Sequence, residues 1–442
     1  MQLDHAFRIS NNACVALTGS GGKTTALFQL ARGLNNAKGQ PVIVSATTHL
    51  HVNQIKLADS HWIGEMSGDF VSLENNLRGV MLVTGPVVGD RTKGLDNETM
   101  RWLHEFSLKH GLPLLIEADG SRQRPLKAPG KDEPPIPSFV GTVVVVAGLS
   151  GLGQPLNTKI VHRPEIYASL SGLGMGEAIT PEAVLRVLTH PAGGIKNIPA
   201  LARRIVLLNQ ADSLEFQAQA KGLARGLLAV FDSIIIASLA QSRIHAVYEQ
   251  VAGIILAAGE ARRFGRPKQL LDYHGQPFVR TVVKTALASG LSPVVVVTGA
   301  NAEAVEAAVA DLPITLARNA DWQTGQSSSI QVGLHVLPHR TGAAIFLLAD
   351  QPQVPPTVLR ALVERHSLEL DPILAPLVND RRANPVLFDR ATFPDLMSLS
   401  GDVGGRDIFS KYPLTYLPWH DESLLLDVDT PEDLKKLRKQ EQ

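Results

Sequence analysis

The 442-residue sequence contains a single cysteine, Cys14, and only 5% aromatic residues. One cysteine cannot form an internal disulfide, and its place in the apolar run ACVALTG favours a buried strand thiol over a nucleophile. Long hydrophobic runs are missing too: VVVVAGL, from Val143, is far shorter than the roughly 18 residues of a membrane span. The first ten residues also lack an apolar signal core. These absences predict a soluble, cytoplasmic protein.

An excess of charge of one sign is also absent. Lys plus Arg and Asp plus Glu number 42 each, and no long block of like charge occurs. Nucleic acids and anionic membranes attract clustered positive charge, for which the composition gives no indication. We therefore expect small-molecule partners, with neither nucleic acid nor membrane among them.

Short apolar runs rich in β-branched residues alternate with helical patterns along the chain. The runs are continuous, as expected of strands in a parallel sheet with helices on both faces. Helices are predicted over 23–38 and 213–230. Strands are predicted at 14–19, 41–47, 80–85, 113–119, 142–148, 204–210 and 233–238; after 250 the rhythm restarts with VAGIILAAG, 293–299, 343–350, 372–376 and 424–429. Since 442 residues also exceed one ordinary core, we predict an α/β protein with two domains, 1–247 and 248–442.

The stretch TGSGGKTT at 18–25 follows an apolar run and opens a helical pattern, which presents backbone NH groups to a phosphate. Gly19 and Gly22 are separated by two residues rather than the four of a standard P-loop, so the spacing is closer to the TGxxGKTT form of the Mur ligases. We predict a P-loop-type domain that binds ATP or GTP with Mg²⁺. The predicted contacts are Gly19, Gly21, Gly22, Lys23, Thr24 and Thr25, with Lys23 on the terminal phosphates and Thr24 on Mg²⁺.

Two further strand ends support a nucleotide site. Asp119 follows LLIEA, as a carboxylate beside a Mg²⁺ site would. NQAD follows RIVLL, and its Asn209 and Asp212 resemble the base-reading NKxD of GTPases. Asn and Asp after a strand are also ordinary helix-capping residues, so base recognition and capping both stay open.

TGSGGKTT, ATTH, IEADGSRQRPLKAPGKDEPPIP and LLNQAD, spread over roughly residues 12–240, together resemble the selenium-dependent hydroxylase accessory proteins of the YqeC type. The resemblance implies nucleotide binding and a task in the maturation of molybdenum hydroxylases. It also implies that Glu117, Asp119, Ser121, Arg122 and Lys127 line the nucleotide end of the sheet.

A second loop, IILAAGEARRFGRPKQLL at 254–271, lacks the lysine–threonine pair of a P-loop. Its amides can still contact a triphosphate while Arg263 and Lys268 supply positive charge as catalytic residues. This suits attack at the α-phosphate with pyrophosphate leaving. The predicted nucleotide contacts are Leu256, Ala257, Ala258, Gly259 and Gly265.

Such chemistry depends on charge neutralisation, so a metal-binding carboxylate should follow another strand. Asp350 ends the apolar run in FLLADQP, and we predict that it binds Mg²⁺ as a catalytic residue. Asp427 and Asp429 in LLLDVDTPEDL are predicted to help. A helix N-cap is the competing interpretation for Asp429.

These motifs, with NADWQTGQSSSIQVGL, NPVLF and GDVGGR, resemble the molybdenum cofactor cytidylyltransferases over about residues 250–440. The resemblance implies a glycosyltransferase-A-like, Rossmann-like domain that transfers CMP from CTP to molybdenum-bound molybdopterin. It implies that Ser327 and Ser328 help to hold nucleotide or cofactor and that Arg406 faces the pterin phosphate. Ala258, in LAAG rather than LAGG, argues for CTP over GTP.

Two alternatives stay open. One is a guanylyl- or sugar-phosphate nucleotidyltransferase of the same fold. The other is a non-catalytic chaperone that binds finished molybdenum cofactor and an apo molybdenum hydroxylase, and uses nucleotide only as a switch.

Overall fold

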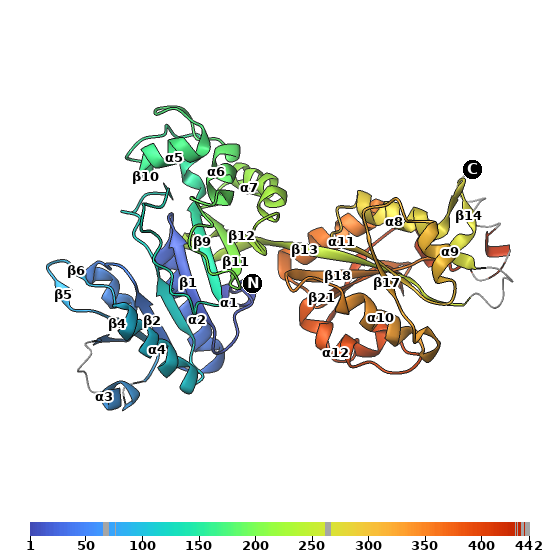
Figure 1. Cartoon of the computed structure of the whole chain (residues 1–442), viewed down its shortest axis with the longest axis horizontal. Helices are drawn as coiled ribbons and strands as arrows, with labels where there is room; N and C mark the ends of the chain where they lie inside the picture. The colour runs from blue at the N-terminus through green and yellow to red at the C-terminus, as the bar shows by residue number, and fades with distance from the viewer. Residues whose placement is uncertain are drawn as a thin grey trace. The chain divides into compact units, whose positions relative to one another are not determined.

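The computed structural model of the chain describes residues 1–64, 70–75, 77–260, 267–428, 430, 432–434 and 437. The chain divides into two compact units, Met1–Tyr248 and Glu249–Gln442 (Figure 1). The boundary lies inside strand β13 (Arg243–Ala257). Among the described residues, we find no helix with the length and apolar character needed to cross a membrane.

The first unit is built on a sheet with the strand order β3-β4-β2-β7-β1-β9-β11-β12. Its strands are β1 (Cys14–Gly19), β2 (Val42–Ala46), β3 (Ser60–Ile63), β4 (Val80–Thr84), β7 (Leu114–Glu117), β9 (Thr142–Gly148), β11 (Arg203–Asn209) and β12 (Ser233–Ser238). Each of these neighbouring pairs is parallel. Parallel strands end at a common carboxyl edge, where ligands of open α/β sheets bind.

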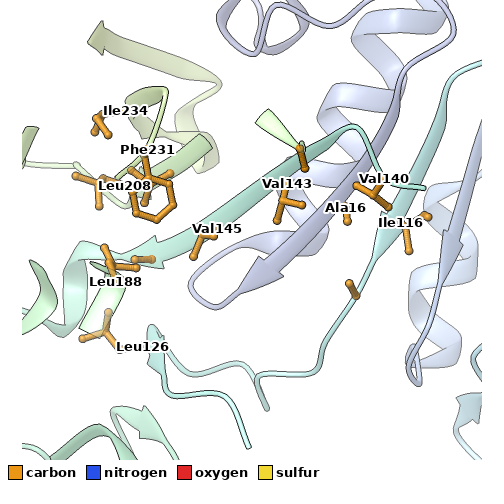
Figure 2. Close-up of a cluster of buried hydrophobic side chains, with 14 of the residues drawn as sticks. Ala16, Ile116, Leu126, Val140, Val143, Val145, Leu188, Leu208, Phe231 and Ile234 are labelled. Carbon is orange, nitrogen blue, oxygen red and sulfur yellow. The ribbon is translucent and has the colours of Figure 1, made fainter. Parts of the chain in front are cut away.

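Both faces of this sheet are buried. Ala16 and Leu17, successive residues of β1 that point to opposite faces, are each 0% exposed. On one face, Val143 and Val145 of β9 belong to a core that includes Leu208 and Phe231 (Figure 2). The continuous apolar runs therefore form helix-covered strands, as predicted.

The helices of the first unit begin at residues suited to capping. Asp96 accepts hydrogen bonds from the Glu98 and Thr99 amides, and Thr180 and Ser213 cap two later helices in the same way. The helices are α1 (Leu3–Ala6), α2 (Lys23–Lys38), α3 (Phe70–Asn75), α4 (Asn97–Lys109), α5 (Pro164–Ser171), α6 (Pro181–Thr189) and α7 (Leu214–Leu227); short strands are β5 (Val87–Val88), β6 (Arg91–Thr92), β8 (Leu126–Lys127) and β10 (Val161–His162). The helix predicted over 23–38 is α2.

The second unit has a mixed sheet with the order β17-β16-β13-β18-β21-β19, and β20 and β22 both pair with β19. The strands are β13, β16 (Val294–Thr298), β17 (Thr315–Arg318), β18 (Thr341–Leu348), β19 (Ile373–Val378), β20 (Arg381–Arg382), β21 (Val386–Asp389) and β22 (Leu414–Pro418). The helices are α8 (Phe278–Ala288), α9 (Ala302–Ala307), α10 (Gln326–His335), α11 (Pro356–Glu369) and α12 (Phe393–Met397). β13 is parallel to β16 and β18, so the loops that follow β13 and β18 lie at one edge.

One sequence-based expectation for the second unit was wrong. The run 424–429 was expected to be a strand, but Glu422–Leu425 forms a 3₁₀ turn whose Leu424 is buried in the core. β21 is antiparallel to β18, so the sheet of this unit is mixed. A short apolar run can be buried either as a strand or as a turn. Such a run also does not determine whether the neighbouring strand is parallel or antiparallel.

Candidate functional sites

The first loop leads from β1 through three residues into α2. Gly19, Gly21 and Gly22 have φ angles of +88°, +85° and +124°, which side-chain-bearing residues rarely adopt. A Cβ on Gly21 would lie 2.4 Å from the Gly148 nitrogen, and one on Gly22 would lie 2.3 Å from Asn209 Nδ2. The glycines are therefore required for this tight passage against the ends of the neighbouring strands.

Lys23 is buried behind the loop. Its Nζ donates to the Gly19 carbonyl at 2.7 Å and lies 3.1 Å from Asp119 Oδ1. Asp119 Oδ2 lies 2.7 Å from Lys127 Nζ and accepts a hydrogen bond from the Gly19 amide at 3.1 Å. Asp119, expected beside Mg²⁺, is thus held between two lysines.

Glu117, two residues earlier, is the carboxylate beside Thr24. Thr24 Oγ1 donates to Glu117 Oε2 at 2.9 Å and accepts from Gln54 Nε2 at 2.9 Å. Burial raises the pKa of Glu117, although Lys23 and Thr24 act in the opposite direction. A nearby cation would favour the charged form of this carboxylate.

Buried hydroxyl groups around the loop fit a phosphate or a hydrated cation. Ser20, in the loop itself, is 1% exposed, and its Oγ has no hydrogen-bond partner among the described residues. The same holds for the buried Oγ1 atoms of Thr47 and Thr48. Because buried polar atoms are nearly always hydrogen-bonded, the chemistry of these residues matches a nucleotide with its metal ion.

Asn209 connects the loop to the end of β12. Its Nδ2 donates to the Gly21 carbonyl at 2.7 Å, and its Oδ1 accepts from the Leu239 amide at 3.0 Å. Asp212 is exposed. A cavity of about 570 Å³ lies nearby, lined by residues that include Thr24, Thr25, Phe28, Leu239 and Ser242. Base recognition by Asn209 and Asp212 stays a prediction.

The charged network continues away from the loop. Lys127 Nζ lies 2.9 Å from Glu133 Oε2, which in turn lies 2.6 Å from Arg163 Nη1. Burial alone would raise the pKa of Glu133. The hydrogen bonds that Glu133 accepts from Arg163 and Lys127 outweigh this effect and lower its pKa to about 2. The neighbouring His162 has its pKa lowered to about 4 by burial, with Arg163 and Lys127 adding repulsion.

We expect His162→Gln to reduce the acid sensitivity of this region. An unfolded imidazole titrates near pH 6.5 and the folded one near 4, so between these values the unfolded chain binds more protons and stability falls as pH drops. Hydrogen–deuterium exchange of the β8 and β10 amides at pH 4 to 7 measures this, and the exposed His190→Gln serves as control. Equal pH dependence in wild type and His162→Gln would contradict the expectation.

The second loop follows β13 at the carboxyl edge of its sheet. Gln269 Nε2 donates to the Ala257 and Gly259 carbonyls at 3.2 and 2.8 Å, which folds the loop's far end back onto its start. Asp350 follows β18, and the Ala349 amide donates to the Leu256 carbonyl at 3.2 Å. The two strand ends are therefore adjacent.

A cavity of about 840 Å³ opens at this edge. Its lining includes the predicted residues Leu256, Ala258, Gly259, Lys268 and Asp350, together with Trp322, Gln326 and Ser329. Lys268 Nζ lies 3.8 Å from Asp350 Oδ2. Ala257 is buried and contributes its carbonyl to the Gln269 contact. Arg263 and Gly265 lie outside the described residues.

The hydroxyls of Ser327 and Ser328 both donate to backbone carbonyls, and their contact with nucleotide or cofactor stays a prediction. Ser327 Oγ donates to the Gly401 carbonyl at 2.6 Å, and Ser328 Oγ donates to the Gly325 carbonyl at 2.8 Å, so both hydroxyls hold the chain. Gln326 and Ser329 of the same helix line the cavity instead. Residues three apart, such as Gln326 and Ser329, lie on the same face of a helix. The sequence motif alone does not determine which face of the helix points to the cavity.

A second cavity of about 640 Å³ shares Leu256, Gln326, Leu348 and Asp350 with the first. Its other lining residues include the predicted Arg406 and Asp427 and two residues that sequence reasoning missed, Arg382 and Asn384. Arg382 stands two residues before Asn384, the first residue of the NPVLF motif, and this was the available signal. Asp429 lies outside the described residues.

The carboxylates of the second cavity fit a divalent cation. Asp350 and Asp427 both line it, and Asp427 Oδ1 accepts a hydrogen bond from Gln351 Nε2 at 2.7 Å. No cluster of three or more His, Cys, Asp or Glu able to hold a metal occurs in the described part of the chain. Two carboxylates suffice for Mg²⁺, which takes most other ligands from water and substrate phosphates.

Comparison with known proteins identifies both units. The YqeC protein family matches residues 15–165, and the MobA-like NTP transferase domain matches residues 253–416. The chain is 31% identical over 210 residues to a protein named YqeC from Escherichia coli, covering 46% of this chain and 77% of that one. The chain belongs to the YqeC family in its first unit and to the MobA-like NTP transferases in its second.

The transferase relatives carry diverse names. The chain is 35% identical over 197 residues to a protein named nicotine blue oxidoreductase from Paenarthrobacter nicotinovorans, covering 42% of this chain and 96% of that one. The crystal structure of Rv0371c from Mycobacterium tuberculosis aligns with 29% identity and a TM-score of 0.39, covering 43% of this chain and 98% of that one. The match of residues 253–416 to the MobA-like NTP transferase domain implies a nucleotide substrate for the second unit.

Proposed function

We propose that the protein acts in the maturation of molybdenum hydroxylases, and that its MobA-like domain transfers CMP from CTP to molybdenum-bound molybdopterin. The products are molybdopterin cytosine dinucleotide and pyrophosphate. The observation that carries the proposal is the meeting of two cavities at Asp350, one beside the LAAG loop and one beside Arg406. A transferase that joins two bulky substrates needs this arrangement.

The residues around the first cavity suit a nucleoside triphosphate. The loop at Ala258 and Gly259 offers backbone amides at a strand end, and Lys268 would stabilise the leaving pyrophosphate. Ala258 in the LAAG motif favours CTP. Arg263 would add a second positive charge to the pyrophosphate side.

Asp350 and Asp427 would hold the divalent cation between the cavities. When bound, the cation neutralises charge on phosphate oxygens. The chain's own contribution is positioning: Gln351 holds Asp427, and the backbone contact between Ala349 and Leu256 keeps the Asp350 strand end beside the nucleotide loop.

The YqeC domain would bind ATP or GTP for an accessory step on the same cofactor. The glycines at positive φ, the Ser20 hydroxyl, which has no hydrogen-bond partner among the described residues, and the Thr24–Glu117 pair support phosphate and Mg²⁺ at this loop. Lys23 would leave Asp119 to reach the phosphates. Asn209, through its bond to the Gly21 carbonyl, would keep the loop in place.

Pyrophosphate release tests the proposal. We expect the full chain with Mg²⁺ and molybdenum-bound molybdopterin to release pyrophosphate with CTP and not with GTP, because Ala258 favours cytidine. Lys23→Ala should leave this release unchanged, since Lys23 belongs to the YqeC domain.

Release with GTP in place of CTP would overturn the cytidylyl assignment. Release with neither nucleotide would overturn the transferase proposal and favour a chaperone. Loss of release in Lys23→Ala would show that the first loop takes part in the transfer itself.

A further inference from the structure

An aspartate that the proposed transfer does not use, Asp402, lines the cavity of about 840 Å³ beside the LAAG loop. Its Oδ1 accepts a hydrogen bond from the Gln326 amide at 3.4 Å, and its Oδ2 accepts none from the described residues. The residues assigned to pyrophosphate and cation, Lys268 and Asp350, lie together at 3.8 Å. A further carboxylate beside the phosphates would repel them, so Asp402 suits another part of the nucleotide.

Asp402 is held against the first turn of α10. Ser327 Oγ, in that turn, donates to the Gly401 carbonyl at 2.6 Å. Gly325, directly before the helix, has a φ angle of +117°, and a Cβ on it would lie 2.4 Å from the Asp402 Cα. The backbone of Asp402 is therefore fixed, and its exposed carboxylate is presented to the cavity from a defined position.

Trp322 connects this wall of the cavity with the LAAG loop. It lines the cavity four residues before Gln326. A Cβ on Gly299 would lie 2.8 Å from the Ala258 Cβ and 2.9 Å from the Trp322 Cβ, so these two residues flank the glycine closely. Ala258 bears on the choice of base in the proposed function. The base is therefore expected on the side of the cavity where Trp322 leads into α10.

Ser329 adds a hydrogen-bond donor to the same wall. It is 5% exposed and lines the cavity, and its Oγ accepts from Asn319 Nδ2 at 2.9 Å. This hydroxyl donates to no described residue, so its proton is available to a ligand. Gln326, which holds Asp402, and Ser329 are three apart and share a face of α10. The wall thus offers an acceptor and a donor side by side.

The edge of cytosine matches this pair of groups. Cytosine carries the N4 amino donor beside the N3 acceptor, whereas uracil carries the O4 acceptor beside the N3–H donor. An ionised carboxylate only accepts hydrogen bonds, and aspartate is a regular partner of the cytosine N4 amino group. Uracil in the same position would direct its O4 at the carboxylate, and two acceptors repel each other.

We propose that Asp402 selects cytosine over uracil: its Oδ2 accepts from the N4 amino group, while Ser329 donates to N3. The assignment rests on the proposed function and deepens it, because Ala258 bears on CTP against GTP and Asp402 distinguishes the two pyrimidine nucleotides. Asp402 also caps α10 from outside, since the N-cap residue Gly325 has no side chain. A test must separate these two roles.

Asp402→Asn separates them, because asparagine keeps an oxygen for the Gln326 amide and replaces the other oxygen with an NH₂ donor that suits uracil O4. Pyrophosphate release by the full chain is measured with Mg²⁺, molybdenum-bound molybdopterin, and CTP or UTP. We expect wild type to favour CTP in kcat/KM by about 10- to 100-fold, the range for a hydrogen bond to a charged group. Asp402→Asn should lose most of this preference, with a lower kcat/KM for CTP and a higher one for UTP.

Asp407→Asn, an exposed aspartate of the same loop region that does not line the cavity, is the matched control and should keep the wild-type preference. Calorimetric binding of CTP and UTP with Mg²⁺ but without acceptor gives a readout that does not depend on transfer. Tighter binding of CTP that is equalised in Asp402→Asn supports the assignment even if no CMP is transferred. A wild-type preference that persists in Asp402→Asn would overturn it. Equal losses for CTP and UTP would also overturn it, because capping alone would then explain the effect.

Discussion

Replacement of Asp350 with asparagine is expected to lower the rate of pyrophosphate release about 10²- to 10³-fold, the range for loss of one charge-stabilising group in an active site. Asp350 lines both cavities and lies 3.8 Å from Lys268. Its side chain is 34% exposed, so folding should depend little on it. The kcat of the variant, measured with saturating CTP and acceptor beside its Tm, tests both statements.

The control is Asp407→Asn, an exposed aspartate of the same unit that does not line either cavity. It should retain wild-type kcat and Tm. Full activity in Asp350→Asn would refute the assignment of this carboxylate to the metal. A large fall in the Tm of Asp350→Asn would instead indicate a structural role.

Replacement of Asp119 with alanine is expected to destabilise the YqeC domain by about 3 to 5 kcal/mol, as removal of one partner from a buried ion pair does. The side chains of Lys23 and Lys127 are each 3% exposed, and both lie within 3.1 Å of the Asp119 carboxylate. The Gly19 amide would lose its acceptor as well. Thermal unfolding followed by calorimetry should show a fall of roughly 10 °C in the transition of this domain.

Asp212→Ala provides the matched control, because Asp212 is exposed and stands at the same edge of the sheet. A double variant with Asp119→Ala and Lys127→Met should regain part of the lost stability, since one of the two stranded charges is removed with its partner. An unchanged Tm for Asp119→Ala would contradict the network.

The sequence predicted the first site well at the level of motifs. TGSGGKTT became a glycine loop and α2, and the apolar runs became the parallel strands beside it. It did not distinguish Glu117 from Asp119, which are two residues apart and so leave the strand on the same side. Lys127 donates to Asp119 and so determines that Asp119, rather than Glu117, is the neutralised carboxylate. This contact depends on tertiary structure.

In the second unit, Asp350 and the LAAG loop could be located because each stands at the end of a recognisable strand. Arg382 could not, because its position depends on a hairpin at β19 and on the antiparallel β21, neither of which was expected. Asn319 Nδ2 donates to the hydroxyls of both Ser328 and Ser329, and such a contact between a loop and α10 depends on tertiary structure.

The shared wall of the two cavities has a kinetic consequence. A dinucleotide product would occupy both cavities at once, because Leu256, Leu348 and Asp350 border each of them. Under the proposed function, such a product would compete with the nucleotide and with the acceptor alike, whereas pyrophosphate would compete only with the nucleotide. Turnover would then be limited by departure of the dinucleotide, and a hydroxylase that takes it directly from the enzyme would accelerate every cycle.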